Sequence, residues 1–435
     1  MKKTLLLLVS AFLTLQLYAQ ETKHVLLISI DGLRPEFYLE KGWDTPNMRN
    51  LMETGVYANG INSIFPSVTY PSHTTIITGA YPASHGVFYN APRGAPNGRW
   101  YWESSLIKTK TLWDACKEAG LTTGSVMWPV TVGAPITWNF PVKRADADDK
   151  SDQLSVTKPL VTPTNLIDEM LNSGVISGND DEFKYPKIDH TIGDMSAFIL
   201  SKHKPNLMAV HFVGADHYQH TNGRESKQAH NAVALIDKEI GRLLTVLENE
   251  KMRANTTIII TGDHGFADDE KAFSPNVLLA KMNLLENKTA QAKFITPGGS
   301  AFLYVKDKKV VPSIVKMLNE LPEDQKVFKI IDRKQLDAIG ADPSASLALA
   351  FNKGVIGKPG NKGELLVDIK GGGNHGYFPD FNEIKTGFII NGAGVASHKE
   401  VFGLGIKDIA PLITDILELP FKAKDGKLFP NILLK

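Results

Sequence analysis

Three apolar runs that each end in Asp or His constrain the fold of this chain more than any other feature. The runs are HVLLISID at 24–31, LMAVHFVGADH at 207–217 and TTIIITGDH at 256–264. Continuous apolar runs of this length are typical of strands buried on both faces of a parallel sheet. Helical patterns, such as SKQAHNAVALIDKEIGRLLTVLENE, lie between them. The alternation predicts an α/β fold whose functional residues collect beyond the carboxyl ends of the strands.

The stretch from about residue 297 to 363 follows a different pattern. It contains AFLYVKD, VVPSIVKMLNEL and KVFKIID, which predict a strand, a helix and a strand without site-type residues. We therefore expect a small inserted α+β subdomain here, within a catalytic domain that spans residues 21–435. After it, GELLVDIK predicts a strand, and a glycine-rich loop carries His375 back toward the site.

The N-terminus predicts export. Lys2 and Lys3 precede a short apolar run, and Leu17-Tyr18-Ala19 supplies a small-residue exit, a pattern typical of a secretory signal peptide over residues 1–20. The run is short for a transmembrane helix. We therefore expect a bacterial periplasmic or secreted protein with no membrane span once the signal peptide is removed.

Charge and cysteine content narrow the class of partner. Removal of residues 1–20 deletes two lysines and no acid, so the formal net charge changes from +1 to −1. A nearly neutral protein lacks the basic face that nucleic-acid binding needs, so we expect a small-molecule substrate and no stable nucleic-acid binding. Cys116 is the only cysteine, which excludes an intramolecular disulfide. Its helical surroundings predict a small buried residue rather than a catalytic thiol.

Acid and imidazole side chains at the strand ends predict a metal centre. An adjacent pair such as Asp263-His264 is costly to bury without partners, and a cation would supply them. Asp216 and His220 are four residues apart, so both would project from one face if that segment is helical. The six candidate ligands are Asp31, Asp216, His220, Asp263, His264 and His375. Three carboxylates and three imidazoles are enough for two cations, and mixed nitrogen and oxygen ligation suits zinc, with manganese or iron as lesser candidates.

Four other histidines, His73, His85, His211 and His217, compete for the same role. We do not expect them to be direct metal ligands. His73 and His85 flank a predicted helix, where they could orient loops or hydrogen-bond to ligands.

The segment FPSVTYPSHTTIITGAYPASHGV contains a candidate nucleophile. Thr69 stands directly before Tyr70-Pro71 at the predicted start of a short helix, where free backbone N–H groups and the helix dipole favour a phosphate. Two interpretations remain open. Thr69 is only the N-cap of this helix, or it is a nucleophile whose hydroxyl is activated by a neighbouring metal.

Together these motifs resemble those of the alkaline phosphatase superfamily, and most closely those of its nucleotide pyrophosphatase/phosphodiesterase family. The resemblance rests on ISIDGLRP, the Thr69 segment, Asp216 with His220, GDHGF and NHGY, and it covers nearly the whole mature chain. It implies an alkaline-phosphatase-like fold, with a central, mostly parallel sheet flanked by helices.

The resemblance also implies a site and a reaction. One zinc ion would be held by Asp216, His220 and His375, and a second by Asp31, Asp263 and His264 with the Thr69 oxygen. Asn90 would donate to a non-bridging phosphate oxygen, and Tyr70 would either stack on a nucleobase or form a hydrophobic wall. The implied reaction is attack of Thr69 on phosphorus, followed by hydrolysis of the phosphothreonine intermediate.

The substrate class is the main open question. A neutral Asn90 favours phosphodiesters or pyrophosphates, which carry less charge on the phosphoryl oxygens than a monoester dianion. Lys143-Arg144 would supply the extra charge for a phosphomonoesterase if the loop folds inward, but the acids that follow favour a solvated loop. Phosphonate hydrolysis is a further alternative. A binding protein with a vestigial site would lack a ligand or the nucleophile, and none is missing.

Overall fold

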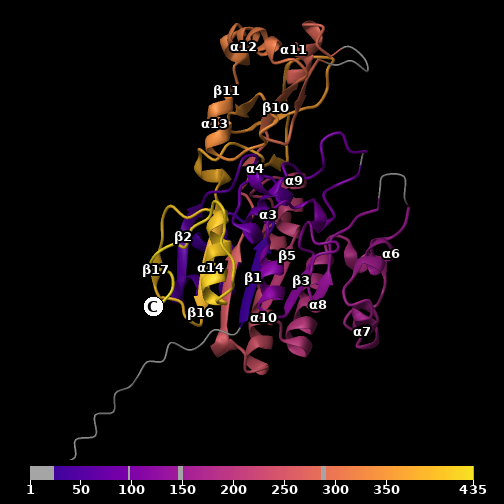
Figure 1. Ribbon diagram of the computed structural model, residues 1–435, viewed down its shortest axis with the longest axis vertical. Coiled ribbons are helices and arrows are strands. Elements are labelled where there is room, and N and C mark those ends of the chain that lie inside the picture. Colours follow the sequence, from indigo (N-terminus) through magenta and orange to yellow (C-terminus); the bar gives the residue numbers. More distant parts are fainter. Residues whose placement is uncertain (1–23, 97, 146–149, 286–290, 435) are drawn as a thin grey trace, which may run out of the picture.

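An eight-stranded sheet forms the centre of the molecule (Figure 1). The structure is a computed structural model that describes residues 24–96, 98–145, 150–285 and 291–434. From edge to edge the strands are β17 (Lys399–Glu400), β2 (Val56–Ile61), β16 (Thr386–Gly392), β6 (Thr256–Thr261), β1 (His24–Ile30), β5 (Leu207–Phe212), β3 (Thr123–Val126) and β4 (Trp138–Phe140). Among these strands only β16 is antiparallel to its neighbours. The predicted mostly parallel sheet is therefore confirmed.

Helices cover both faces of this sheet, which explains the continuous apolar runs. In β1, Leu26 and Ile28 belong to a core shared with α8 (Ile188–His203) and α10 (Lys227–Asn249). Val25 and Leu27 belong to a second core shared with α3 (Thr69–Thr78), α5 (Leu112–Glu118) and α14 (Ile409–Ile416). Successive side chains of a strand point to opposite faces, so both sets must be apolar. Cys116 on α5 is buried in the second core, as predicted.

The strand register brings the functional segments to one edge of the sheet. Ile30 at the end of β1 pairs with Phe212 at the end of β5, and β6 lies on the other side of β1. Asp31 follows β1 directly, Asp263 follows β6 by two residues, and α9 (Gly214–Asn222) begins just after β5. Helices α3 and α9 lie at this end of the sheet (Figure 1).

A second, four-stranded antiparallel sheet lies beyond the same end (Figure 1). Its order is β11 (Phe328–Ile331), β12 (Leu347–Phe351), β10 (Ser300–Val305) and β9 (Ala292–Ile295). Helices α11 (Pro275–Lys281) and α12 (Val311–Asn319) share a separate hydrophobic core with this sheet. The insertion at about 297–363 stays a prediction, and β9 belongs to this sheet although it precedes residue 297.

Short elements complete the described chain. The helices are α1 (Glu36–Leu39), α2 (Pro46–Thr54), α4 (Pro82–His85), α6 (Gln153–Thr157), α7 (Leu166–Asn172) and α13 (Arg333–Ala338). Strands β8 (Lys271–Phe273), β13 (Val355–Gly357) and β14 (Leu366–Asp368) form one small sheet, and β7 (Ala267–Asp268) and β15 (Gly373–Asn374) form another. The β7–β15 pair brings the His375 loop beside the segment that follows His264.

Two further predictions concern membrane spans and the signal peptide. None of the described helices has the length and apolar character needed to cross a membrane. The predicted signal peptide, residues 1–20, lies outside the described residues.

Candidate active site

Two overlapping groups of acid and imidazole side chains lie at the strand ends. The first contains Asp216, His220 and His375, the second contains Asp31, Asp216 and His264, and the candidate ligand atoms within each group lie within 4.8 Å of one another. Asp216 Oδ1 is 3.3 Å from His220 Nε2 and 3.7 Å from His375 Nε2. The expected α9 geometry is confirmed, since Asp216 and His220 lie one helical turn apart.

Asp263 extends the second group. Its Oδ2 lies 3.2 Å from His264 Nε2, and Asp31 Oδ1 lies 3.4 Å from the same nitrogen. The rings of His264 and His375 stack with centroids 3.6 Å apart, so the two groups are contiguous. The structure thus brings all six predicted ligands together, while the division of these ligands between two ions stays a prediction.

The three predicted histidine ligands share one hydrogen-bond arrangement. The Nδ1 atoms of His220, His264 and His375 lie 2.8, 3.1 and 2.9 Å from the carbonyl oxygens of Gly373, Gly265 and Ser67. A carbonyl only accepts, so each Nδ1 must carry the hydrogen, and each neutral ring then keeps its Nε2 lone pair for another partner. Metal-binding histidines are held in this way.

Several buried polar atoms at the centre of the cluster have no hydrogen-bond partner among the described residues. They are Asp31 Oδ1, Asp216 Oδ1, Asp263 Oδ2 and His264 Nε2. Buried polar atoms are normally satisfied, and each one left without a partner is destabilising. These atoms are all electron-pair donors and converge on one region. The donor set therefore fits divalent cations that prefer oxygen and nitrogen ligands.

Electrostatics support the same interpretation. Burial, together with the carboxylates of Asp216 and Asp263, raises the pKa of Asp31 well above its ordinary value. Burial opposes the ionised form of Asp216 too, but the nearby His220 and His375 hold its pKa below the ordinary value. Burial lowers the pKa of His375 to about 3, which favours its neutral, ligating form. Burial opposes the charged form of His220, but Asp216 raises its pKa to about 9. Crowded carboxylates beside imidazoles are an arrangement that a cation stabilises, with release of the imidazole proton.

The start of helix α9 is held by a buried carboxylate on α8. Asp189 accepts hydrogen bonds from the backbone N–H groups of Val213 and Gly214 at 2.8 and 2.9 Å. A Cβ atom on Gly214 would lie 2.1 Å from Asp189 Oδ2, so only glycine allows this approach. Burial raises the pKa of Asp189 to about 7. Asp189 therefore fixes the start of the helix that carries Asp216 and His220.

We expect Asp189→Asn to weaken both the fold and metal uptake. The amide keeps one acceptor but places an NH₂ group against a backbone N–H group, which leaves a buried donor unsatisfied at a cost of about 1–3 kcal/mol. The start of α9 would shift and displace Asp216. Thermal unfolding and metal stoichiometry measure the two effects. Asp168→Asn is the control, because the Asp168 side chain is exposed on α7. Wild-type values for both quantities in Asp189→Asn would contradict this role.

Thr69 is the first residue of α3, not its N-cap. Val68 occupies the N-cap position in an extended conformation, so the interpretation of Thr69 as a capping residue is wrong. Its side chain lines the same cavity as Asp31 and Asp216. His73, one turn later, hydrogen-bonds through Nδ1 to the Thr69 carbonyl oxygen at 2.8 Å and fixes the backbone at this position.

Asn90 is oriented by the same helix. The Tyr70 N–H donates to Asn90 Oδ1 at 3.0 Å, so the Asn90 NH₂ group is the end that can donate to a ligand. Both residues line the cavity beside Thr69. The Tyr70 ring is buried and packs edge-on against Trp100, with centroids 5.0 Å apart.

The cavity that contains these side chains has a volume of about 580 Å³. Arg144 lines it, with the guanidinium over the Trp100 ring at 5.1 Å from the centroid. Arg144 is exposed, as expected for a solvated loop, and it also lines the cavity, where the Trp100 ring supports its side chain. A role for Lys143-Arg144 in supplying charge to a substrate stays a prediction. The acids that favoured a solvated loop lie within residues 146–149, outside the described residues.

Further cavity residues had little or no signal in the sequence. His211 Nε2 lies 3.2 Å from Asp31 Oδ2, and its Nδ1 lies 3.1 Å from the Met127 carbonyl oxygen. The His217 ring stacks on Tyr185 with centroids 3.7 Å apart. The position of His211 near the end of β5 was the available signal, whereas no motif pointed to Tyr185. That neither histidine binds metal directly stays a prediction.

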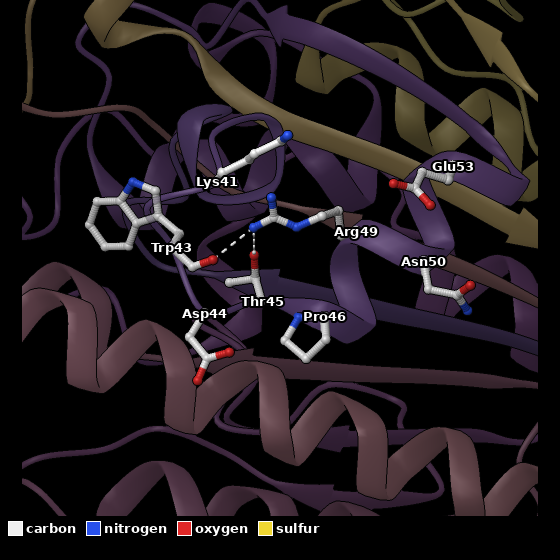
Figure 2. Close-up of a pocket in the computed structure, with 8 residues that line it drawn as sticks. All are labelled: Lys41, Trp43, Asp44, Thr45, Pro46, Arg49, Asn50 and Glu53. Atoms are coloured by element: carbon white, nitrogen blue, oxygen red, sulfur yellow. Dashed lines mark hydrogen bonds between the residues drawn. The ribbon is translucent and has the colours of Figure 1, made fainter.

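A second hollow of about 460 Å³ lies around the start of α2 and contains none of the predicted site residues (Figure 2). Arg49 in this hollow donates to the Trp43 carbonyl oxygen and to Thr45 Oγ1. Its guanidinium is therefore already used to hold the start of α2, and the larger cavity is the better candidate for catalysis.

Comparison with known families identifies the family of the chain. The sequence model of the family described as "Type I phosphodiesterase / nucleotide pyrophosphatase" matches residues 25–377, a range that contains every predicted ligand. The chain belongs to this family. It is therefore an enzyme of the phosphodiesterase/nucleotide pyrophosphatase class, and the resemblance inferred from the motifs is confirmed.

Curated members of the family align with nearly the whole chain. Ectonucleotide pyrophosphatase/phosphodiesterase family member 7 of Mus musculus is 23% identical over 427 residues, which cover 95% of this chain and 87% of the relative. Family member 5 of Homo sapiens is 21% identical over 421 residues, which cover 94% of this chain and 77% of the relative.

Solved structures of the family share the fold. Human ectonucleotide pyrophosphatase/phosphodiesterase 5 superposes with a TM-score of 0.66 at 18% identity, covering 93% of this chain and 97% of that chain. An inactive threonine-to-alanine variant of the murine protein, in complex with AMP, superposes with a TM-score of 0.65 at 18% identity and covers 94% and 97% of the two chains. The alkaline-phosphatase-like α/β fold is thereby confirmed.

Proposed function

We propose that this enzyme is a zinc-dependent hydrolase of phosphodiester or pyrophosphate bonds that acts through a phosphothreonine intermediate on nucleotide-type substrates. The observation that carries the proposal is the position of Thr69. Thr69 is the first residue of α3 and lines the cavity that Asp31 and Asp216 also line. One buried oxygen of each of these carboxylates has no hydrogen-bond partner among the described residues. The inactive threonine-to-alanine murine relative solved with AMP supports both the nucleophile and the nucleotide.

The proposed division of the zinc ligands differs from the two groups at one position, because Asp216 is assigned to the first ion alone and Asp263 takes its place at the second. Asp216, His220 and His375 would hold one ion, and Asp31, Asp263 and His264 would hold the other with the Thr69 oxygen. When bound, the ions would lower the pKa of a coordinated hydroxyl or water and neutralise charge that develops on the apical oxygens.

The residues of the chain would perform the displacement as follows. Thr69 Oγ1 forms a bond to phosphorus while the bond to the leaving oxygen breaks, and the hydroxyl proton is released. The Asn90 NH₂ group donates to a non-bridging oxygen, and the free N–H groups at the start of α3 stabilise the same negative charge. Water then attacks the phosphothreonine from the opposite side, which breaks the bond to Thr69 Oγ1 and regenerates its hydroxyl.

Recognition of the rest of the substrate would use the aromatic part of the cavity. Tyr70 and Tyr185 both line it, and flat aromatic side chains suit a nucleobase. We also propose export of the protein, which the signal-like N-terminus and the ectonucleotide names of its relatives support.

Arg144 supports phosphomonoester hydrolysis as a second candidate function. A monoester dianion carries one more charge than a diester on its phosphoryl oxygens, and a guanidinium at the cavity would stabilise it. Arg144 lines the cavity with its guanidinium over the Trp100 ring, and its charge offsets part of the rise in the pKa of Asp31 that burial causes.

The rates on p-nitrophenyl thymidine monophosphate and on p-nitrophenyl phosphate distinguish the two functions. We expect the zinc-loaded enzyme to prefer the diester. Arg144→Ala should lower the monoester rate about tenfold, the usual scale for one charged hydrogen bond, and change the diester rate less. Lys143→Ala is the matched control, because Lys143 does not line the cavity. A wild-type preference for the monoester would overturn the first function and favour the second.

A further inference from the structure

The backbone that carries Asn90 is held from both sides. The Asn90 carbonyl oxygen accepts from the Tyr101 N–H at 3.0 Å, and its side-chain oxygen accepts from the Tyr70 N–H. The preceding residue, Tyr89, points away from this cavity into a hydrophobic cluster, where its ring packs edge-on against Phe302 on β10. The two neighbours therefore connect different parts of the molecule.

A chain of hydrogen bonds between buried and half-buried side chains continues from Tyr89 into the second sheet. The hydroxyl oxygens of Tyr89 and Tyr304 are 2.5 Å apart, and the Tyr304 hydroxyl donates to Asp342 Oδ2 at 2.6 Å. Because the single proton of Tyr304 is used on Asp342, Tyr89 must be the donor in the first bond. The other carboxylate oxygen of Asp342 accepts from the Ser344 N–H at 2.7 Å, which fixes the end of the chain.

The surroundings of these hydrogen bonds keep Tyr89, Tyr304 and Asp342 in place. Tyr89 and Asp342 are buried, and the guanidinium of Arg93 covers the Tyr304 ring at 4.2 Å from its centroid. Buried hydrogen bonds in such a low-dielectric environment strengthen one another. Tyr304 lies on β10, so the chain ties the loop of Asn90 to the second sheet, which contributes no predicted ligand or nucleophile.

We propose that Tyr304 is a positioning residue of the reaction: through Tyr89, and with Asp342 as the final acceptor, it fixes the loop from which Asn90 donates to the phosphoryl group. This inference rests on the proposed role of Asn90. A hydrogen-bond donor to a transition state loses much of its effect when it is displaced by a fraction of the bond length, since stabilisation depends on its preorganised position.

A double-mutant cycle tests the proposal. We expect Tyr304→Phe, which keeps the ring and removes the hydroxyl, to lower kcat/KM for p-nitrophenyl thymidine monophosphate about tenfold with zinc content unchanged. In an Asn90→Ala background the same change should have less than about a twofold effect, because residues that act through one group are not additive. Tyr89→Phe should reproduce the result if Tyr304→Phe folds poorly.

Tyr38→Phe is the control, because the buried Tyr38 hydroxyl donates to the Ala58 carbonyl oxygen and Tyr38 does not line the cavity. It should lower the unfolding temperature and leave kcat/KM unchanged. An equal loss from Tyr304→Phe with and without Asn90 would overturn the inference and leave the proposed function intact. No effect of Asn90→Ala alone would instead overturn the proposed role of Asn90, and the inference with it.

Discussion

Thr69→Ala is expected to reduce turnover of p-nitrophenyl thymidine monophosphate by at least about 10³-fold, because the variant lacks the oxygen that would attack phosphorus. The change removes only a few atoms from a buried position in the cavity, so the metal ligands should stay in place. Zinc content by mass spectrometry should therefore remain near the wild-type value. Thr69→Ser should retain part of the activity, since it keeps a hydroxyl group.

Thr74→Ala is the control for this prediction. Thr74 is also buried on α3, but its hydroxyl donates to the Tyr70 carbonyl oxygen rather than lining the cavity. Its loss should affect stability more than turnover.

Acid-quenched wild-type enzyme should carry phosphate on Thr69, detectable by peptide mass spectrometry. Full activity in Thr69→Ala, or a phosphate on another residue, would assign the nucleophile elsewhere.

Removal of metal is expected to abolish activity and to destabilise the fold. The metal-free protein keeps the carboxylates of Asp31, Asp216 and Asp263 close together, and one oxygen of each is buried without a hydrogen-bond partner among the described residues. Zinc at a thousand times its dissociation constant would stabilise the folded state by about 4 kcal/mol per site. Chelation should therefore lower the unfolding temperature, and added zinc should restore both temperature and turnover.

Asp216→Asn sharpens this test, because Asp216 is a proposed ligand of one ion and its carboxylate also lies within 4.8 Å of the ligand atoms of Asp31 and His264, which are proposed for the other ion. We expect it to reduce zinc stoichiometry more than His220→Ala does, since His220 belongs to one group. Thermal unfolding with and without chelator measures the coupling between metal and fold. An enzyme that keeps full activity after exhaustive chelation would contradict the metal centre.

The strand-end residues were predictable from the sequence for a physical reason. Apolar runs of this length are typical of strands buried on both faces, so Asp31 and Asp263 were expected at the carboxyl ends of these strands, and parallel strands share one edge. The start of α3 was less predictable, because Thr suits the N-cap position far better than Val, yet the backbone places Val68 there without a side-chain capping hydrogen bond.

Contacts between distant segments were not predictable. Arg144 joins the cavity because Trp100 supports its side chain, and Tyr89 reaches Tyr304 although the two are far apart in the sequence. Such pairs follow neither helix nor strand periodicity. The antiparallel direction of β16 has the same origin, since its pairing with β2 and β6 is decided by the path of the chain after His375.

The ligands are spread over most of the chain, from Asp31 just after the first strand to His375 near the last strands of the sheet. A nascent chain that lacks its later part would contain the early carboxylate ligands without the later imidazole ligands. Binding of both proposed ions therefore requires synthesis at least as far as His375, so full zinc stoichiometry reports that nearly the whole polypeptide has been made. Truncated products would be recognisable by the metal they fail to retain.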